Sequence, residues 1–172
     1  MNDRTERLAV TIEQKNEEML DLLAGLESSD LDRPCADPGG STVGAVVAHL
    51  AEGYGLVLGW IARTTGQETD GQRADASPAP QTHDHTLHHG EPERDVVEHI
   101  AQLRAGGAVW AALIRGLADD QLERVPAATP MITDGTQTLA DIMEMMVEHQ
   151  SAHLTYIKEA VADPAVPSRS AI

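Results

Sequence analysis

Residues 142–160 read IMEMMVEHQSAHLTYIKEA, the most strongly periodic stretch of the chain. Apolar residues recur there every three or four positions, which is the spacing of an amphipathic α-helix. The stripe defined by this spacing contains Ile142, Met146, His149, His153, Tyr156 and Ala160. Two imidazoles therefore stand where the pattern favours Leu or Ile. Because a buried imidazole needs partners for its ring nitrogens, we expect His149 and His153, one helical turn apart, to bind one metal ion together.

Three further segments show helical periodicity, and strand signals are absent. The expected helices cover residues 4–26, 43–63, 93–117 and 138–162. Ser41 or Thr42 is the expected N-cap of the second helix, and Thr138 with Asp141 forms a capping box at the start of the last. The sequence therefore predicts an all-α protein, a four-helix bundle, with one domain over residues 1–172.

The second predicted helix carries a third histidine on its apolar seam. The seams predicted for the first and second helices are Leu8, Ile12, Lys15, Met19, Leu22 and Leu26, and Val46, His49, Gly53, Leu56 and Trp60. His49 is the expected third metal ligand. Glycine inside a helix is unfavourable by ~1 kcal/mol relative to alanine. Gly53, and Gly107 on the third helix, therefore either open a pocket or allow close helix packing.

A long polar segment, residues 64–91, separates the second and third helices and is predicted to be a mobile crossover. Such a connection makes the second and third helices parallel and the second and last antiparallel. Antiparallel packing brings His49 close to the level of His149 and His153. The histidine-rich residues 83–89 lie in this crossover. We expect them to bind metal only adventitiously, because ordering the segment costs entropy; the alternative is metal capture or a lid.

Composition limits the classes of function. The 172 residues include 28 acidic and 12 basic side chains, a net charge of -16, which argues against nucleic acid and anionic membrane partners. No segment of membrane length is expected, because His49 and Glu52 interrupt the apolar stretch 43–62. The charged start of the chain lacks a secretory signal, and the one cysteine fits a cytoplasmic protein. That cysteine, Cys35, is expected to be an ordinary loop thiol in acidic surroundings that raise its pKa.

Several short motifs together resemble the DinB/YfiT-like superfamily. They are Ser41-Thr42-Val43 leading into Val47-Ala48-His49-Leu50-Ala51, then Gly116-Leu117-Ala118-Asp119-Asp120-Gln121-Leu122, and finally Glu148-His149-x-x-x-His153-Leu154. The resemblance implies a four-helix bundle with a divalent-metal site, zinc or nickel, formed by His49, His149 and His153. It also implies a homodimer. Members with an assigned activity include thiol-dependent S-transferases and isomerases that use bacillithiol, mycothiol or glutathione. The chain lacks the extra C-terminal domain of the mycothiol-dependent maleylpyruvate isomerases.

Three functions fit this pattern. The leading hypothesis is a metal-dependent enzyme that transfers a low-molecular-weight thiol, such as mycothiol or bacillithiol, onto a small-molecule electrophile. The second is a metal-assisted hydrolase with the same ligands, and the third is a non-catalytic metal-binding stress-response protein. Glu52, Glu148 and Tyr156 are candidates for groups around the ligands. No catalytic residue, substrate or specific metal is assigned.

Overall fold

The computed structural model describes residues 3–66 and 92–162. The α-helices are α1 (Asp3–Ala24), α2 (Val43–Thr65), α3 (Pro92–Arg115), the short α4 (Asp119–Leu122) and α5 (Leu139–Ala162), and a 3₁₀ turn, η1 (Ser28–Asp30), follows α1. Within the described residues there is no β-strand, so the all-α prediction is confirmed. Most of the predicted crossover, including residues 83–89, lies outside this part of the chain, and α2 continues through its first two positions.

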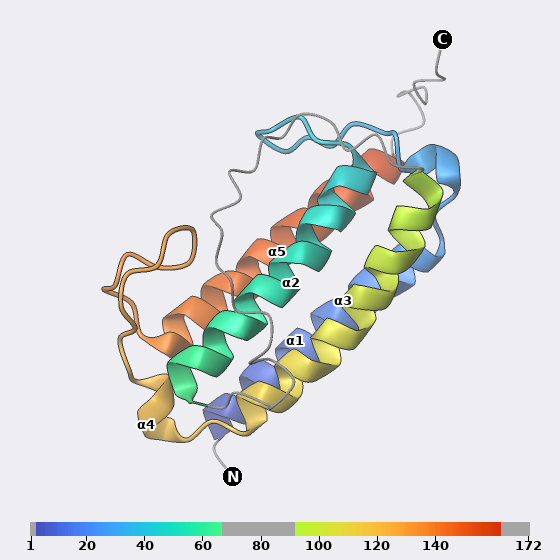
Figure 1. The fold of residues 1–172 in the computed structure, drawn as a ribbon. Coiled ribbons are helices and arrows are strands. Elements are labelled where there is room, and N and C mark those ends of the chain that lie inside the picture. Colours follow the sequence, from blue (N-terminus) through green and yellow to red (C-terminus); the bar gives the residue numbers. More distant parts are fainter. Residues whose placement is uncertain (1–2, 67–91, 163–172) are drawn as a thin grey trace.

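The four long helices lie side by side (Figure 1). Helices α1 and α5 run in one direction, and α2 and α3 run in the other. As predicted, α2 and α3 are therefore parallel, and α2 and α5 are antiparallel. Helix α3 packs extensively against both α1 and α2, whereas the interface between α2 and α5 is much sparser. The two helices that carry the histidines are thus the less tightly packed neighbours.

The predicted helix caps are present. The Thr42 hydroxyl accepts a hydrogen bond from the Ala45 N–H at 3.3 Å. At the start of α5, the Asp141 N–H donates to the Thr138 hydroxyl at 3.2 Å, and the Thr138 N–H donates to the Asp141 carboxylate at 3.0 Å. Each side-chain oxygen satisfies a backbone donor that the helix leaves without a partner. The caps fix where α2 and α5 begin, and hence the level of their histidines.

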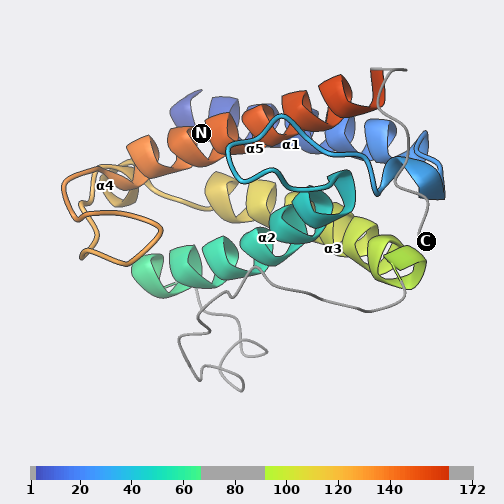
Figure 2. The ribbon, with the colours of Figure 1, turned by 90° about the horizontal axis from the view of Figure 1, so that it is seen from above.

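The segment 31–42 connects η1 to α2 and passes the end of α5 (Figures 1 and 2). The Val43 N–H donates to the Arg33 carbonyl at 2.9 Å, and the Arg33 guanidinium donates to the Ala160 carbonyl at 3.4 Å. The Cys35 N–H donates to the Ser41 carbonyl at 2.8 Å, which closes the segment on itself. These contacts hold the segment beside the ends of α2 and α5.

The buried helix faces differ from the predicted seams on three helices. On α1, Asn16 and Leu23 are buried in place of Lys15, Leu22 and Leu26. On α2, Leu56 is 51% exposed, and the buried face is formed by Val43, Val46, Val47, Leu50, Tyr54, Val57, Leu58 and Ile61. On α5, the buried face is formed by Leu139, Met143, Gln150, Leu154 and Ile157, so the prediction that His149 and His153 lie inside is wrong. On α1 and α5 the core-facing positions lie one residue along from those predicted, a rotation of about 100°.

Helix α2 has the length and composition of a membrane span, contrary to the expectation that no segment reaches that length. However, 56% of its apolar window is buried inside the protein. A helix that is apolar on most sides is typical of a protein core as well as of a membrane. Its burial against α3 explains its composition here.

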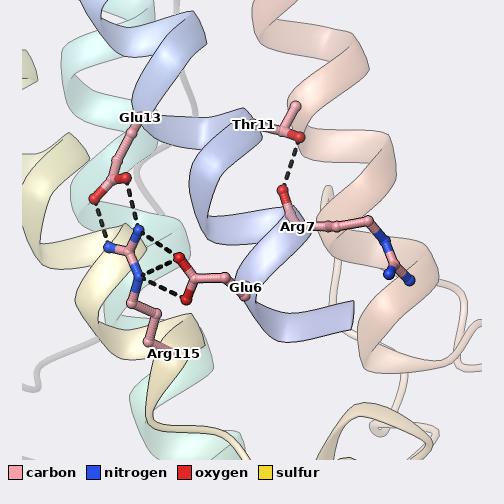
Figure 3. Close-up of polar contacts among 5 residues, drawn as sticks. All are labelled: Glu6, Arg7, Thr11, Glu13 and Arg115. Atoms are coloured by element: carbon pink, nitrogen blue, oxygen red, sulfur yellow. Dashed lines mark hydrogen bonds and ion pairs between the residues drawn. The ribbon is translucent and has the colours of Figure 1, made fainter. Parts of the chain in front are cut away.

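One arginine links α3 to two carboxylates of α1 (Figure 3). The Arg115 guanidinium donates to the Glu6 carboxylate at 3.1 Å and to a Glu13 oxygen at 2.7 Å. Hydrogen bonds from Arg115 lower the pKa of Glu13, against a small opposing effect of burial. Because Glu6 and Glu13 lie two turns apart on α1, the single guanidinium fixes the register of these antiparallel helices.

Two adjacent glycines set how closely α3 approaches its neighbours. A Cβ atom at Gly107 would lie 2.3 Å from Cγ of Asn16, and one at Gly106 would lie 2.9 Å from a ring carbon of Tyr54. Gly107 therefore serves close packing, and its neighbour is Asn16 of α1. Gly53 is different, because a Cβ there would meet no atom within 4 Å. The two interpretations given for these glycines thus apply to one residue each.

This contrast predicts opposite effects of the same substitution. Gly107→Ala is expected to lower the free energy of unfolding by about 1–3 kcal/mol, because the added methyl group must displace Asn16. Gly53→Ala is the matched control and is expected to raise it by about 0.5–1 kcal/mol through helix propensity. Urea unfolding followed by circular dichroism measures both. Equal effects of the two substitutions would contradict this account of the packing.

Candidate metal centre

Three histidine rings from two helices converge in the groove between α2 and α5. Nε2 of His49 lies 3.3 Å from Nε2 of His149, and Nε2 of His153 lies 3.1 Å from the same atom. One ligand atom from each ring can be chosen so that all three lie within 4.8 Å of one another. His49 and His149 are exposed, and His153 is half-buried. The structure therefore brings together the three residues that the sequence predicted as ligands, at the rim of the groove.

Hydrogen bonding alone does not account for this cluster. Nε2 of a neutral imidazole has either one proton or one lone pair. Nε2 of His149, however, has two nitrogen neighbours at contact distance. A single proton or lone pair makes one well-aligned hydrogen bond, so one neighbour stays without a good partner.

A metal ion fits the same geometry well. Zn–N bonds of about 2.0–2.1 Å at tetrahedral angles put neighbouring ligand nitrogens about 3.3 Å apart. The two observed separations, 3.3 and 3.1 Å, agree with this value. Three neutral imidazoles are also a suitable donor set for zinc and nickel. The cluster can thus hold one divalent ion and leave at least one coordination position for another molecule.

The surroundings keep two of the histidines neutral. Burial, together with the charge of His149 and His49 in their protonated forms, lowers the pKa of His153 to about 4. Burial and His49 also lower the pKa of His149. Since only the neutral imidazole binds a metal ion, both shifts favour the ligand form at neutral pH.

Asp37 is the acidic group that acts electrostatically on the cluster, and the sequence analysis did not identify it. Its negative charge opposes the lowering of the His153 pKa. Burial opposes ionisation of Asp37, but hydrogen bonds from the Ser41 N–H at 2.8 Å and the Gly39 N–H at 3.0 Å lower its pKa overall. The only signal in the sequence is the turn-forming Asp37-Pro38-Gly39 motif before α2. That motif predicts a loop and says nothing about which helix the loop approaches.

The three residues proposed to surround the ligands lie in different places. Tyr156 has its ring edge-on to His153, with ring centroids 6.0 Å apart. Glu52 and Glu148 are exposed, and within the described ranges neither makes a hydrogen bond or ion pair with a histidine. His153 Nδ1 is buried and has no hydrogen-bond partner within the same ranges. Tyr156 is therefore the best placed of the three.

Cys35 lies in the segment next to the site but is not activated. It is 7% exposed, and burial together with the nearby Asp37 raises the pKa of its thiol to about 11. The nucleophilic form of cysteine is the thiolate, which is scarce at neutral pH when the pKa is this high. The structure supports the prediction of an ordinary loop thiol, with burial as the larger cause.

Comparison with known protein families assigns the chain. A family model described as the DinB superfamily matches residues 11–157. The chain belongs to the DinB superfamily. Neither the comparison with curated proteins nor that with solved structures gives a match. The matched range of this DinB-superfamily protein contains all three histidines, so the histidine cluster lies within the region that defines the family.

The lowered histidine pKa values predict how the stability of this DinB-superfamily protein depends on pH without metal. The unfolded chain binds protons near pH 6.5, whereas folded His153 does so only near pH 4. Stability is therefore fully present above about pH 6.5 and decreases as the pH falls toward 4. Urea unfolding in a chelator at several pH values measures the slope. His153→Gln should flatten the slope in this range, and an unchanged slope in the variant would contradict the assignment.

Proposed function

We propose that the protein is a divalent-metal-dependent enzyme in which His49, His149 and His153 hold one zinc or nickel ion. The observation that supports this proposal is the convergence of three imidazole nitrogens at the spacing of metal ligands. We propose further that its reaction is the transfer of a low-molecular-weight thiol, such as mycothiol or bacillithiol, onto an electrophilic small molecule. Membership of the DinB superfamily supports that choice of reaction.

The chain supplies three conditions for this chemistry. The neutral histidines present lone pairs toward one point, the absence of a side chain at Gly53 leaves free space one turn beyond His49, and the Tyr156 ring lies against His153. A divalent cation held by the histidines lowers the pKa of a thiol or water bound beside it. In the transfer, a bond forms between the thiol sulfur and the electrophilic carbon, the leaving group departs with its electron pair, and the thiol proton goes to solvent.

The proposed assembly is a DinB-like four-helix bundle that forms a cytoplasmic homodimer. Exposed apolar side chains on α2 and α3 support association, since Leu56 is 51% exposed, Val97 70% and Val109 53%. The net charge of -16 disfavours nucleic acid and anionic lipid as partners. A small molecule is therefore the proposed substrate.

Metal content is the first measurement that tests the site. Untagged protein is expected to contain about one divalent ion per chain by elemental mass spectrometry. The double variant His149→Ala with His153→Ala should lose nearly all of it, because one histidine alone makes a weak site.

The matched control replaces His83, His85, His88 and His89 by alanine and leaves the three-histidine cluster intact. This variant should keep its metal. Metal that follows residues 83–89, or wild-type protein without metal, would contradict the proposed site.

The reaction is tested with and without a thiol. Conjugation of 1-chloro-2,4-dinitrobenzene with mycothiol or bacillithiol is expected to be accelerated by the metal-loaded protein and to lose this acceleration in the double histidine variant. Hydrolysis of a p-nitrophenyl ester without any thiol is the comparison. Ester turnover without thiol transfer would favour the hydrolase, and neither activity in metal-loaded protein would favour a non-catalytic metal-binding protein.

A further inference from the structure

Three polar side chains from three different helices meet in the core of the protein. Asn16 of α1 is 7% exposed, Tyr54 of α2 is 5% exposed, and Gln150 of α5 is 2% exposed. We call these three residues the polar core cluster. Each occupies a core-facing position of its helix, where an apolar side chain would bury more favourably. Their presence therefore needs a physical explanation.

The cluster is connected through the tyrosine hydroxyl. The Tyr54 hydroxyl donates to Oδ1 of Asn16 at 3.4 Å. Burial raises the pKa of Tyr54, and the Gln150 amide opposes that shift by interacting with the same hydroxyl. Neither polar atom of Gln150 makes a hydrogen bond of ordinary length within the described part of the chain. Gln150 is thus oriented by one weak contact and is costly to bury in any other arrangement.

The tyrosine itself is held firmly in place. Its ring packs edge-on against Trp110 of α3, with ring centroids 5.1 Å apart, and it also lies against Gly106. Asn16 lies against Gly107 of the same helix. Helix α3 therefore fixes Tyr54 and Asn16, and these two present a fixed polar target to α5.

The polar core cluster lies close in sequence to the metal centre. Gln150 directly follows His149 on α5, and Tyr54 lies five residues after His49 on α2. The direct interface between α2 and α5 is sparse. Packing between these two helices consequently contributes little to the relative positions of the histidines.

Apolar packing alone leaves the rotation of α5 poorly determined. The helix has adjacent apolar residues at successive turns, which are Ile142 with Met143, Met146 with Val147, and Tyr156 with Ile157. Either member of each pair can face a core, so two rotations about 100° apart bury similar apolar surface. Only one of them brings the Gln150 amide to Tyr54.

The geometry points to Gln150 as a positioning residue that, through Tyr54 and Asn16, selects the rotation of α5 at which His149 and His153 face His49. This role rests on the proposed metal site. A buried polar group that specifies one arrangement at some cost in stability is known from helix assemblies, where a single buried amide selects the register. Here the specified arrangement is the one that assembles the three imidazoles.

The test compares Gln150→Leu with Met143→Leu, a matched control on the buried face of the same helix. Binding of Co²⁺ is measured by competition with a chelator, and its visible absorption spectrum reports the geometry of the ligands. Gln150→Leu is expected to weaken Co²⁺ binding by about ten- to a hundredfold and to change the spectrum, while the metal-free protein melts at the same or a higher temperature. Met143→Leu should change the affinity by less than about twofold.

Tyr54→Phe provides a second variant that retains the ring packing against Trp110 and decides the question if Gln150→Leu does not fold. It should weaken Co²⁺ binding in the same way, and combining it with Gln150→Leu should add little further loss, because both remove the same contact. Wild-type affinity and spectrum in Gln150→Leu, or in Tyr54→Phe, would overturn the inference.

A readout on metal-free protein separates this inference from the proposed function. Long-range ¹H–¹⁵N spectra of the imidazoles should shift for His149 and His153 in Gln150→Leu and stay unchanged in Met143→Leu. If wild-type protein binds no Co²⁺, the proposed function fails, and these spectra still decide whether Gln150 positions the rings. Unchanged imidazole signals in Gln150→Leu would overturn the positioning role whether or not metal binds.

Discussion

The close approach of α3 to α1 and α2 is the constraint on which the arrangement depends. Gly106 and Gly107 are adjacent, so consecutive positions of one helix turn toward two different neighbours. Any larger residue would push α3 away from Asn16 or from Tyr54. Because α3 contacts both of these helices closely, it acts as the common support that places α2 relative to α1. The position of His49 in space follows from that support.

Much of the fold could be predicted from the sequence, because helix ends have strong local signals. Caps such as Thr42 and Thr138 set helix starts, and no predicted end of a long helix differs from the structure by more than two residues. The buried faces of α1 and α5 were wrong by one position. A repeat of three and four residues fits two adjacent faces when neighbouring residues are both apolar. Only contacts with other helices, such as that of Gln150 with Tyr54, distinguish them.

The histidine cluster was predicted correctly as a set and incorrectly in its environment. Four-residue spacing within α5 and antiparallel packing against α2 are sufficient to bring the rings together. Their exposure was not predictable, because it depends on the rotation of α5. The approach of Asp37 depends on the path of the segment 31–42, which is held by contacts such as that of Arg33 with the Ala160 carbonyl. Such contacts between distant parts of the chain have no local signature.

Gly53 gives the groove a property that its charged and aromatic residues do not. It lies one turn beyond His49 on the same side of α2, and the space where its side chain would be is empty. The bulk of a molecule that reaches Nε2 of His49 is therefore limited here by a single position. Side chains of increasing size at residue 53 would narrow this entrance stepwise while the three imidazoles stay in place. Selectivity for ligand size is thus adjustable independently of the chemistry, by one substitution at a time.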